Sequence, residues 1–187
     1  MQFDFARKAI LFKKPRRLFL GLILTSFACS LHADFAHEYT VQAVRTLNFA
    51  RFTEWSSNAL KDTNNVVNLC VLGQPIVQNA FSEIEKRPAG GKLIKIFHLT
   101  QGSNFEQCKV LFISGLESHE TKELLHQLQG LPILTIGEDE DFIANKGMVQ
   151  LKMDEGWIKM IINLTAVKKA GLSINSRVLR IAKVLYK

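Results

Sequence analysis

The sequence lacks the short motifs that identify common enzyme classes. It contains no G-x-S-x-G, H-E-x-x-H, P-loop or G-x-G-x-x-G pattern. The acidic run at residues 138–141 lacks the glycine of a calcium loop, which favours a solvated turn. No metal-ligand spacing relates the histidines outside the N-terminal segment, which are His37, His98, His119 and His126. The sequence therefore predicts a protein that is not an enzyme and has no metal or cofactor.

Long hydrophobic runs are scarce as well. The apolar run Leu18–Ala28 follows six basic residues, precedes small residues ending at Ala33, and is short for a membrane span. We therefore predict a signal peptide over residues 1–33. Cys29 is an alternative lipid-anchor site, but Ser26 stands where a lipoprotein signal has an aliphatic residue. An uncleaved anchor is a third alternative.

The chain beyond the predicted signal peptide has little excess charge. The whole sequence has 24 basic and 17 acidic residues, for a net charge of +7. Removing residues 1–33 takes away six basic residues and Asp4, which leaves 18 basic and 16 acidic residues, or +2. The basic pI therefore belongs mostly to the targeting segment, and we infer no nucleic-acid binding. The remaining length, roughly 150 residues, suits one domain with a single core.

Cysteine is rare, and only Cys70 and Cys108 follow the predicted signal peptide. An even pair in an exported domain makes a disulfide the default expectation, with two separate buried thiols as the alternative. Cys70 lies late in its predicted strand, whereas Cys108 lies just before the apolar run Val110–Ile113. In simple parallel register they would be too far apart, because a bridge needs Cα atoms within about 7 Å. A bridge therefore requires a staggered register or a loop that folds back.

One apolar, β-branched stretch, Val66–Gly73, is predicted as the central buried strand. It ends at a glycine with Pro75 shortly after, as a parallel strand leading into a helix does. Other predicted strands are residues 92–99, 109–114, 132–136, 148–153 and 157–162, and predicted helices are residues 36–55, 75–86, 117–129, 163–170 and 175–186. This order predicts an α/β fold: a single three-layer domain with a mostly parallel central sheet, helices on both faces, and a C-terminal hairpin plus two helices.

Two groups of side chains are candidates for binding a partner. Phe49, Phe52 and Trp55 end the first predicted helix, and aromatic side chains are favoured anchors of protein interfaces. The alternative is that Phe52 and Trp55 fold into the domain. Arg177 and Arg180 form part of a basic stripe on the last predicted helix, which suits an acidic partner or, alternatively, a solvated face.

Several segments, taken in order, resemble one family of small exported proteins. They are Asn48–Trp55, Leu69–Gly73, Cys108–Ser114, Pro132–Ile136, Phe142, Gly147-Met148, Ile162–Leu164, Ala170–Ser176 and Leu179–Ala182. This set is similar to the YfiR-like family of periplasmic proteins over nearly all of residues 34–187. The chain departs from the family pattern at Ser56, where proline is usual, and at Lys146, where a second glycine is common. The cysteines of a second disulfide found in some members are missing.

The resemblance implies an α/β domain over residues 34–187, a Cys70–Cys108 disulfide and a non-enzymatic regulator in the periplasm. Understood members bind the periplasmic sensor region of an inner-membrane diguanylate cyclase and repress it, which limits cyclic-di-GMP and biofilm formation. The sequence leaves a homodimer open. The alternative function is a periplasmic module that binds a small ligand at the strand ends near Gly73 and Gly137.

Overall fold

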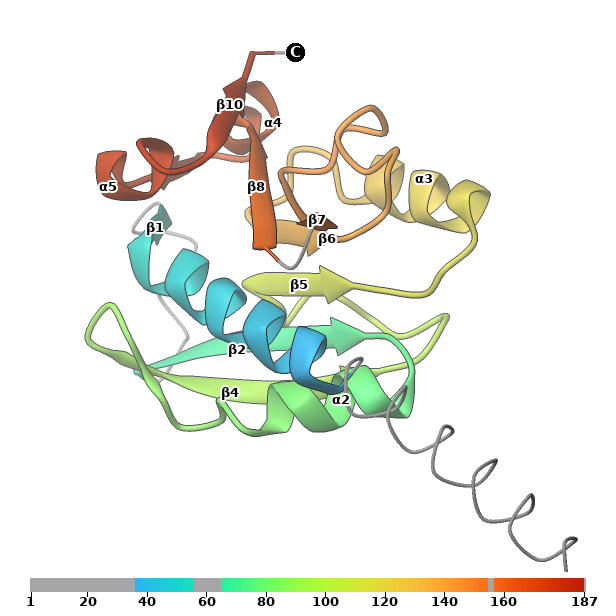
Figure 1. Ribbon diagram of the computed structural model, residues 1–187, viewed down its shortest axis with the longest axis vertical. Coiled ribbons are helices and arrows are strands. Elements are labelled where there is room, and N and C mark those ends of the chain that lie inside the picture. The colour runs from blue at the N-terminus through green and yellow to red at the C-terminus, as the bar shows by residue number, and fades with distance from the viewer. Residues whose placement is uncertain (1–35, 56–64, 155–156, 187) are drawn as a thin grey trace, which may run out of the picture. The chain divides into compact units, whose positions relative to one another are not determined.

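The computed structural model describes residues 36–55, 65–154 and 157–186 (Figure 1). The predicted signal peptide, Cys29 and Ser56 lie outside the described residues. None of the described helices is long and apolar enough to cross a membrane.

A curled, mostly parallel sheet forms the centre of the domain, with the strand order β10-β8-β7-β6-β5-β2-β4-β3. Its strands are β2 (Val66–Leu72), β3 (Pro88–Ala89), β4 (Lys92–Leu99), β5 (Val110–Ile113), β6 (Leu134–Gly137), β7 (Val149–Asp154), β8 (Trp157–Asn163) and β10 (Lys183–Leu185). The strands from β4 to β7 in this order are parallel. The β7–β8 pair is the antiparallel hairpin that the sequence predicts. The α/β fold with a mostly parallel sheet is therefore confirmed.

The helices α2, α3 and α4 each begin at residues that favour the N-terminus of a helix. The N-terminal helix is described over residues 36–52, and the others are α2 (Pro75–Ser82), α3 (Ser118–Gln127), α4 (Leu164–Lys169) and α5 (Ser176–Leu179). Pro75 opens α2, where its missing N–H costs nothing. Glu117 and Glu120 form a capping box at α3. Asn163 caps α4 by accepting a hydrogen bond from the Ala166 N–H at 3.1 Å, as predicted.

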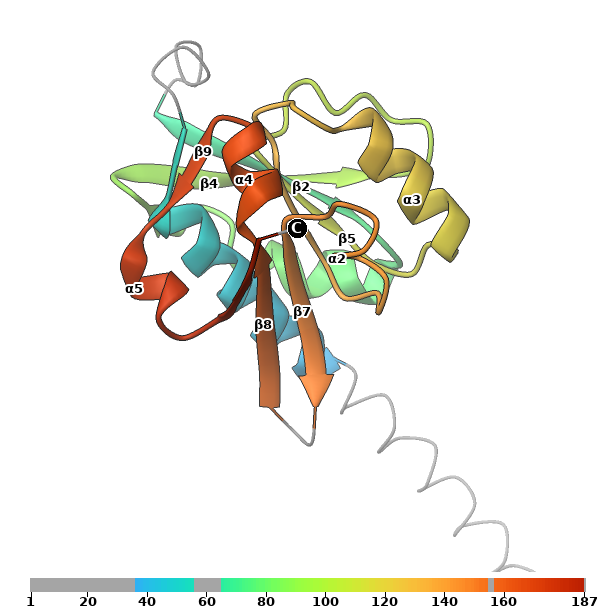
Figure 2. The same cartoon turned by 90° about the horizontal axis from the view of Figure 1, so that it is seen from above.

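The central strand β2 is buried on both faces, and its alternation defines two layers of core. Leu69 and Val71 face a cluster that includes the N-terminal helix and α2. Cys70 and Leu72 face a second cluster, which includes Leu124 and other residues of α3. Figure 2 shows these helices on opposite sides of the sheet. Helices therefore cover both faces, which explains why β2 is apolar without interruption.

The disulfide between Cys70 and Cys108 is present, with a Cα–Cα distance of 5.7 Å. The register of β2 and β5 is simple, because Cys70 lies opposite Leu111. The loop before β5 folds back, since the Cys108 N–H donates to the Phe105 carbonyl at 2.9 Å. The second of the two geometries considered for the bridge is therefore the one adopted.

The prediction of one long helix over residues 175–186 is wrong. The helix α5 has four residues, a turn follows, and β10 then pairs in parallel with β8. Val178 is buried as expected, but Ile181, expected to face inward, is 66% exposed. The reason is that β8 offers unpaired backbone groups at the edge of the sheet, and pairing with them satisfies the chain's own N–H and C=O groups.

The first helix is shorter than the predicted range of residues 36–55. Its last residues leave the helix and form β1 (Thr53–Trp55), which pairs antiparallel with β9 (Leu172–Ile174). The Asn175 N–H also donates to the Phe52 carbonyl at 2.8 Å. These contacts between distant parts of the sequence attach the start of α5 to the end of the N-terminal helix.

Candidate functional site

A groove of about 190 Å³ lies between the N-terminal helix and α5, and is called the α5 groove below. Its lining comes from three parts of the chain that the β1–β9 pairing brings together. They are Arg45, Asn48, Phe49 and Phe52 of the N-terminal helix, Met160 of β8, and Arg177, Val178 and Ile181 at α5. The groove therefore combines apolar side chains with two guanidinium groups.

Three of the residues predicted to bind a partner meet in this groove. Phe49 is 1% exposed and belongs to the core, whereas Phe52 is half-buried and packs against it. Arg177 is exposed on α5. The structure thus brings part of the aromatic group and part of the basic group together, which the sequence presents as separate candidates.

The other two predicted residues lie outside the lining of the α5 groove. Trp55 is 9% exposed, and its indole N–H donates to the Pro132 carbonyl at 3.1 Å. This packing is what the alternative interpretation, folding into the domain, predicts for Trp55. Arg180 is exposed directly after α5. A binding role for either residue stays a prediction.

Sequence reasoning missed Arg45, Met160 and Ile181 as groove residues. Arg45 precedes Phe49 by four positions and Phe52 by seven, so helical spacing could have placed it on the same face. Ile181 could not be found, because the predicted long helix turns it inward. Met160 lies on β8, far from Phe52 in the sequence, although both residues line the same groove. Sequence spacing therefore could not place Met160 in the groove.

The strand ends proposed as an alternative ligand site are closely packed. A Cβ atom added at Gly137 would lie 2.3 Å from the Phe142 ring. At Gly73 it would lie 3.3 Å from the Val77 side chain and 3.5 Å from Ser114. Phe142 is fully buried there, so it fills the space that a ligand at Gly137 would need.

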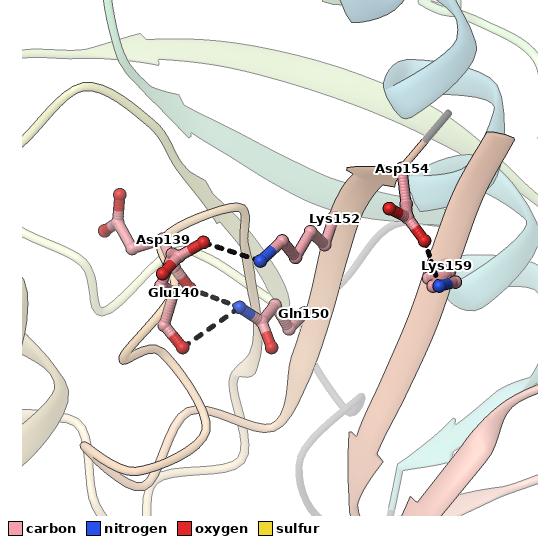
Figure 3. A network of polar contacts seen from close by, with 6 residues as sticks. All are labelled: Asp139, Glu140, Gln150, Lys152, Asp154 and Lys159. Carbon is pink, nitrogen blue, oxygen red and sulfur yellow. Dashed lines mark hydrogen bonds and ion pairs between the residues drawn. The ribbon is translucent and has the colours of Figure 1, made fainter. Parts of the chain in front are cut away.

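Side chains of α3 and β7 donate hydrogen bonds to the acidic turn at residues 138–141, and Figure 3 shows those from β7. Gln150 of β7 donates to the backbone carbonyls of Asp139 and Glu140, and Lys152 pairs with the Glu140 carboxylate at 2.5 Å. Thr121 of α3 donates to Asp139 at 2.9 Å. Among the described residues no group of three histidine, cysteine, aspartate or glutamate side chains is placed to hold a metal ion. The turn is therefore a structural link between α3 and β7.

Glu138 links the N-terminal helix to the ends of β5 and β6. Its carboxylate accepts hydrogen bonds from Gln42 at 3.0 Å and from Ser114 at 2.5 Å. Burial, together with the negative charge of Glu138, raises the pKa of Glu38 above its usual value, although a hydrogen bond from Gln42 opposes the change. The same two causes raise the pKa of the Tyr39 phenol. The cluster therefore makes the Glu38 carboxyl harder to ionise in the folded protein than in the unfolded chain.

The comparisons with known proteins identify the family. A family model described as YfiR/HmsC-like matches residues 39–183, which is most of the chain and nearly all of the described domain. No curated protein matches the sequence. The matched range includes the disulfide and the α5 groove. The chain therefore belongs to the YfiR/HmsC-like family, whose proteins regulate diguanylate cyclases and are not catalytic.

Proposed function

We propose that this protein is a periplasmic regulator that binds the periplasmic region of an inner-membrane diguanylate cyclase and represses it. By doing so it limits cyclic-di-GMP and biofilm formation. The observation that carries the proposal is the family match over residues 39–183. The predicted signal peptide and the Cys70–Cys108 disulfide support the compartment, because disulfides persist in the oxidising periplasm.

The α5 groove is the proposed contact surface for the cyclase. Its exposed side chains combine the two chemistries that interface centres favour, an apolar patch and arginine. Ile181 is 66% exposed and lines the groove with half-buried Phe52 and exposed Arg177. Burying Ile181 against a partner removes apolar surface from water, which stabilises the complex.

The charge of the groove indicates the chemistry of the segment that it binds. Arg45 and Arg177 line it and Arg180 follows α5, whereas no carboxylate is among its lining residues. Neither salt bridge found in the described part of the chain involves these arginines. The complementary partner is a segment with acidic and apolar side chains, because carboxylates accept paired hydrogen bonds from guanidinium groups.

A binding experiment with matched variants tests the surface. The purified chain without residues 1–33 is titrated against the detergent-solubilised cyclase, and affinity is measured by surface plasmon resonance. Arg177→Glu and Ile181→Glu should each weaken binding at least about tenfold, or about 1.4 kcal/mol. Lys122→Glu, which makes the same charge change as Arg177→Glu at an exposed position of α3, serves as the control and should bind as the wild type does.

Two results would count against the proposal, and they mean different things. If the wild-type chain does not bind the cyclase at all, the proposed function fails. If the wild-type chain binds the cyclase and both groove variants bind it as tightly as the wild type does, the function stands but the contact surface lies elsewhere.

A further inference from the structure

A second pocket, of about 160 Å³, lies between the end of α3 and α4, away from the α5 groove. Its apolar wall comes from Leu125, Leu128, Met148 and Ala166. Its polar lining includes Thr135, Lys146, Asn163 and Lys169. A cavity of about 150 Å³ holds a molecule the size of benzene, so this one suits a small organic molecule.

Asn163 lines this pocket and has an unused hydrogen-bond donor. Its side-chain oxygen accepts from the Ala166 N–H at 3.1 Å, which fixes the other end of the amide as the NH₂ group. That nitrogen, Nδ2, is buried and has no hydrogen-bond partner in the described part of the protein. A buried donor without an acceptor is costly, and Asn163 is 0% exposed. A small movement of the Asn163 side chain that brings Nδ2 to the wall of the pocket would let an acceptor atom there remove this cost.

Thr135 adds a second polar group to the lining. It is 2% exposed, and its hydroxyl oxygen accepts from the Met148 N–H at 3.1 Å. Because that bond uses the oxygen, the hydroxyl proton can donate to an acceptor in the pocket. Asn163 and Thr135 together can therefore offer donors to one group with two acceptor oxygens.

The charge around the pocket is positive. Lys146 and Lys169 line it, both are exposed, and no carboxylate is among the lining residues. The ion pairs found in the described ranges involve neither lysine. Two unopposed ammonium groups favour an anion over a neutral molecule of the same shape.

The backbone at Lys146 is unusual as well. Its φ angle is 71°, in the left-handed region that glycine adopts freely and other residues rarely do. A lysine there is strained, and strain of this kind is concentrated at functional sites. The strain also provides a useful variant, since Lys146→Gly removes the charge while relieving the backbone.

From this geometry we infer that the pocket binds a small organic acid, a carboxylate carrying an apolar body. The apolar body lies against Leu125, Leu128 and Met148. The carboxylate accepts hydrogen bonds from Asn163 Nδ2 and Thr135, while Lys146 and Lys169 attract its charge. The site is separate from the proposed cyclase contact, and its existence does not depend on that function.

Binding to the isolated chain without residues 1–33 tests the inference. Hexanoate, benzoate and phenylacetate are titrated by isothermal titration calorimetry and two-dimensional NMR, with benzamide as the neutral match for benzoate. We expect saturable binding of at least one acid, with a dissociation constant below about 1 mM. Shifted amide signals should centre on residues 125–130, 146–148 and 163–169. Benzamide should bind at least about tenfold more weakly than benzoate if benzoate is the acid bound.

Variants separate the site from general folding effects. Lys169→Gln and Lys146→Gly should each weaken binding several-fold, and Lys146→Gly should leave Tm unchanged or raised. Lys168→Gln, on the same helix but outside the lining, should bind as the wild type does. Asn163→Asp keeps the capping oxygen and replaces the donor with a negative charge, so it should abolish binding.

The inference is overturned if none of the acids binds saturably. It is also overturned if benzamide binds as tightly as benzoate, or if Lys168→Gln and Lys169→Gln have equal effects. None of these three results would bear on the cyclase, because no cyclase is present in the measurement.

Discussion

Cys70 and Cys108 are both fully buried, and their bond joins the central strand to the loop that precedes β5. Cys70 faces the α3 side of the sheet along with Leu72. On the opposite side of the sheet, Glu138 joins the N-terminal helix to the ends of β5 and β6. The disulfide therefore fixes a loop to the central strand, and the Glu138 hydrogen bonds fix the N-terminal helix to the ends of β5 and β6.

Removing the disulfide should lower the free energy of unfolding by about 2–4 kcal/mol, because the bond closes a loop and restricts the unfolded chain. The two cysteines are separated by 38 positions. The Cys70→Ala/Cys108→Ala double variant is compared with the wild type by urea unfolding followed by circular dichroism. The reduced wild type is the control that keeps both side chains. A double variant as stable as the oxidised protein would show that the bond adds no stability.

The raised pKa of Glu38 predicts the direction in which the unfolding free energy changes with pH. The folded protein holds this proton more tightly than the unfolded chain does. The stability that Glu38 contributes is therefore present below its ordinary pKa of 4.5 and lost as pH rises through the folded-state value. Glu38→Gln should flatten the decline in unfolding free energy that begins as pH rises above 4.5.

Urea titrations at several pH values measure this effect. Glu85→Gln, at an exposed position after α2, is the control that makes the same substitution away from Glu138. If Glu38→Gln and the wild type have parallel profiles, burial and the charge of Glu138 do not raise the pKa of Glu38.

At the scale of elements, the turn between β6 and β7 is held by one aromatic ring. Phe142 packs against both Gly137 and Gly147, and a Cβ atom at either glycine would lie 2.3 Å from the ring. Gln150 and Lys152 hold the same turn from β7 (Figure 3). Glycine at both positions is therefore explained by close packing against Phe142.

Gly137→Ala should lower the unfolding free energy by about 1–3 kcal/mol, since the added methyl group overpacks the core. Gly73→Ala is the matched control and should cost less, because its nearest neighbour would be 3.3 Å away. In a Phe142→Ala background the Gly137→Ala change should cost almost nothing, which a double-mutant cycle measures. Additive effects would show that the two positions do not interact.

Elements with strong local signals could be predicted from the sequence. The apolar run of β2, the Asn163 cap of α4 and the antiparallel pairing of β7 with β8 each depend on nearby residues. The end of the chain could not be predicted in this way. Val178 and Leu185 fit a helical spacing, but the open edge of β8 recruits residues 183–185 as a strand. Strand pairing depends on partners distant in sequence, which periodicity does not report.

The candidate site shows the same limit. The sequence indicates Phe49, Phe52 and Arg177 as binding residues, but only the β1–β9 pairing places them in one groove. Exposed Ile181 follows from the short α5, which the helical spacing conceals. The free donor of Asn163 is equally hidden, because the sequence accounts for its capping oxygen and not for the other end of the amide.

For the whole molecule, membership of the YfiR/HmsC-like family and the basic, apolar α5 groove together support a protein that acts by binding another protein. The net charge of +2 beyond residue 33 is small, so the basic groove is a local feature and not a consequence of overall charge.

The most direct test of this account is the cellular concentration of cyclic-di-GMP, measured by mass spectrometry after deletion of the gene. Deletion should raise the nucleotide several-fold. The wild-type gene and the Lys122→Glu variant should restore the original level, while Arg177→Glu should not. An unchanged nucleotide level after deletion would contradict the account.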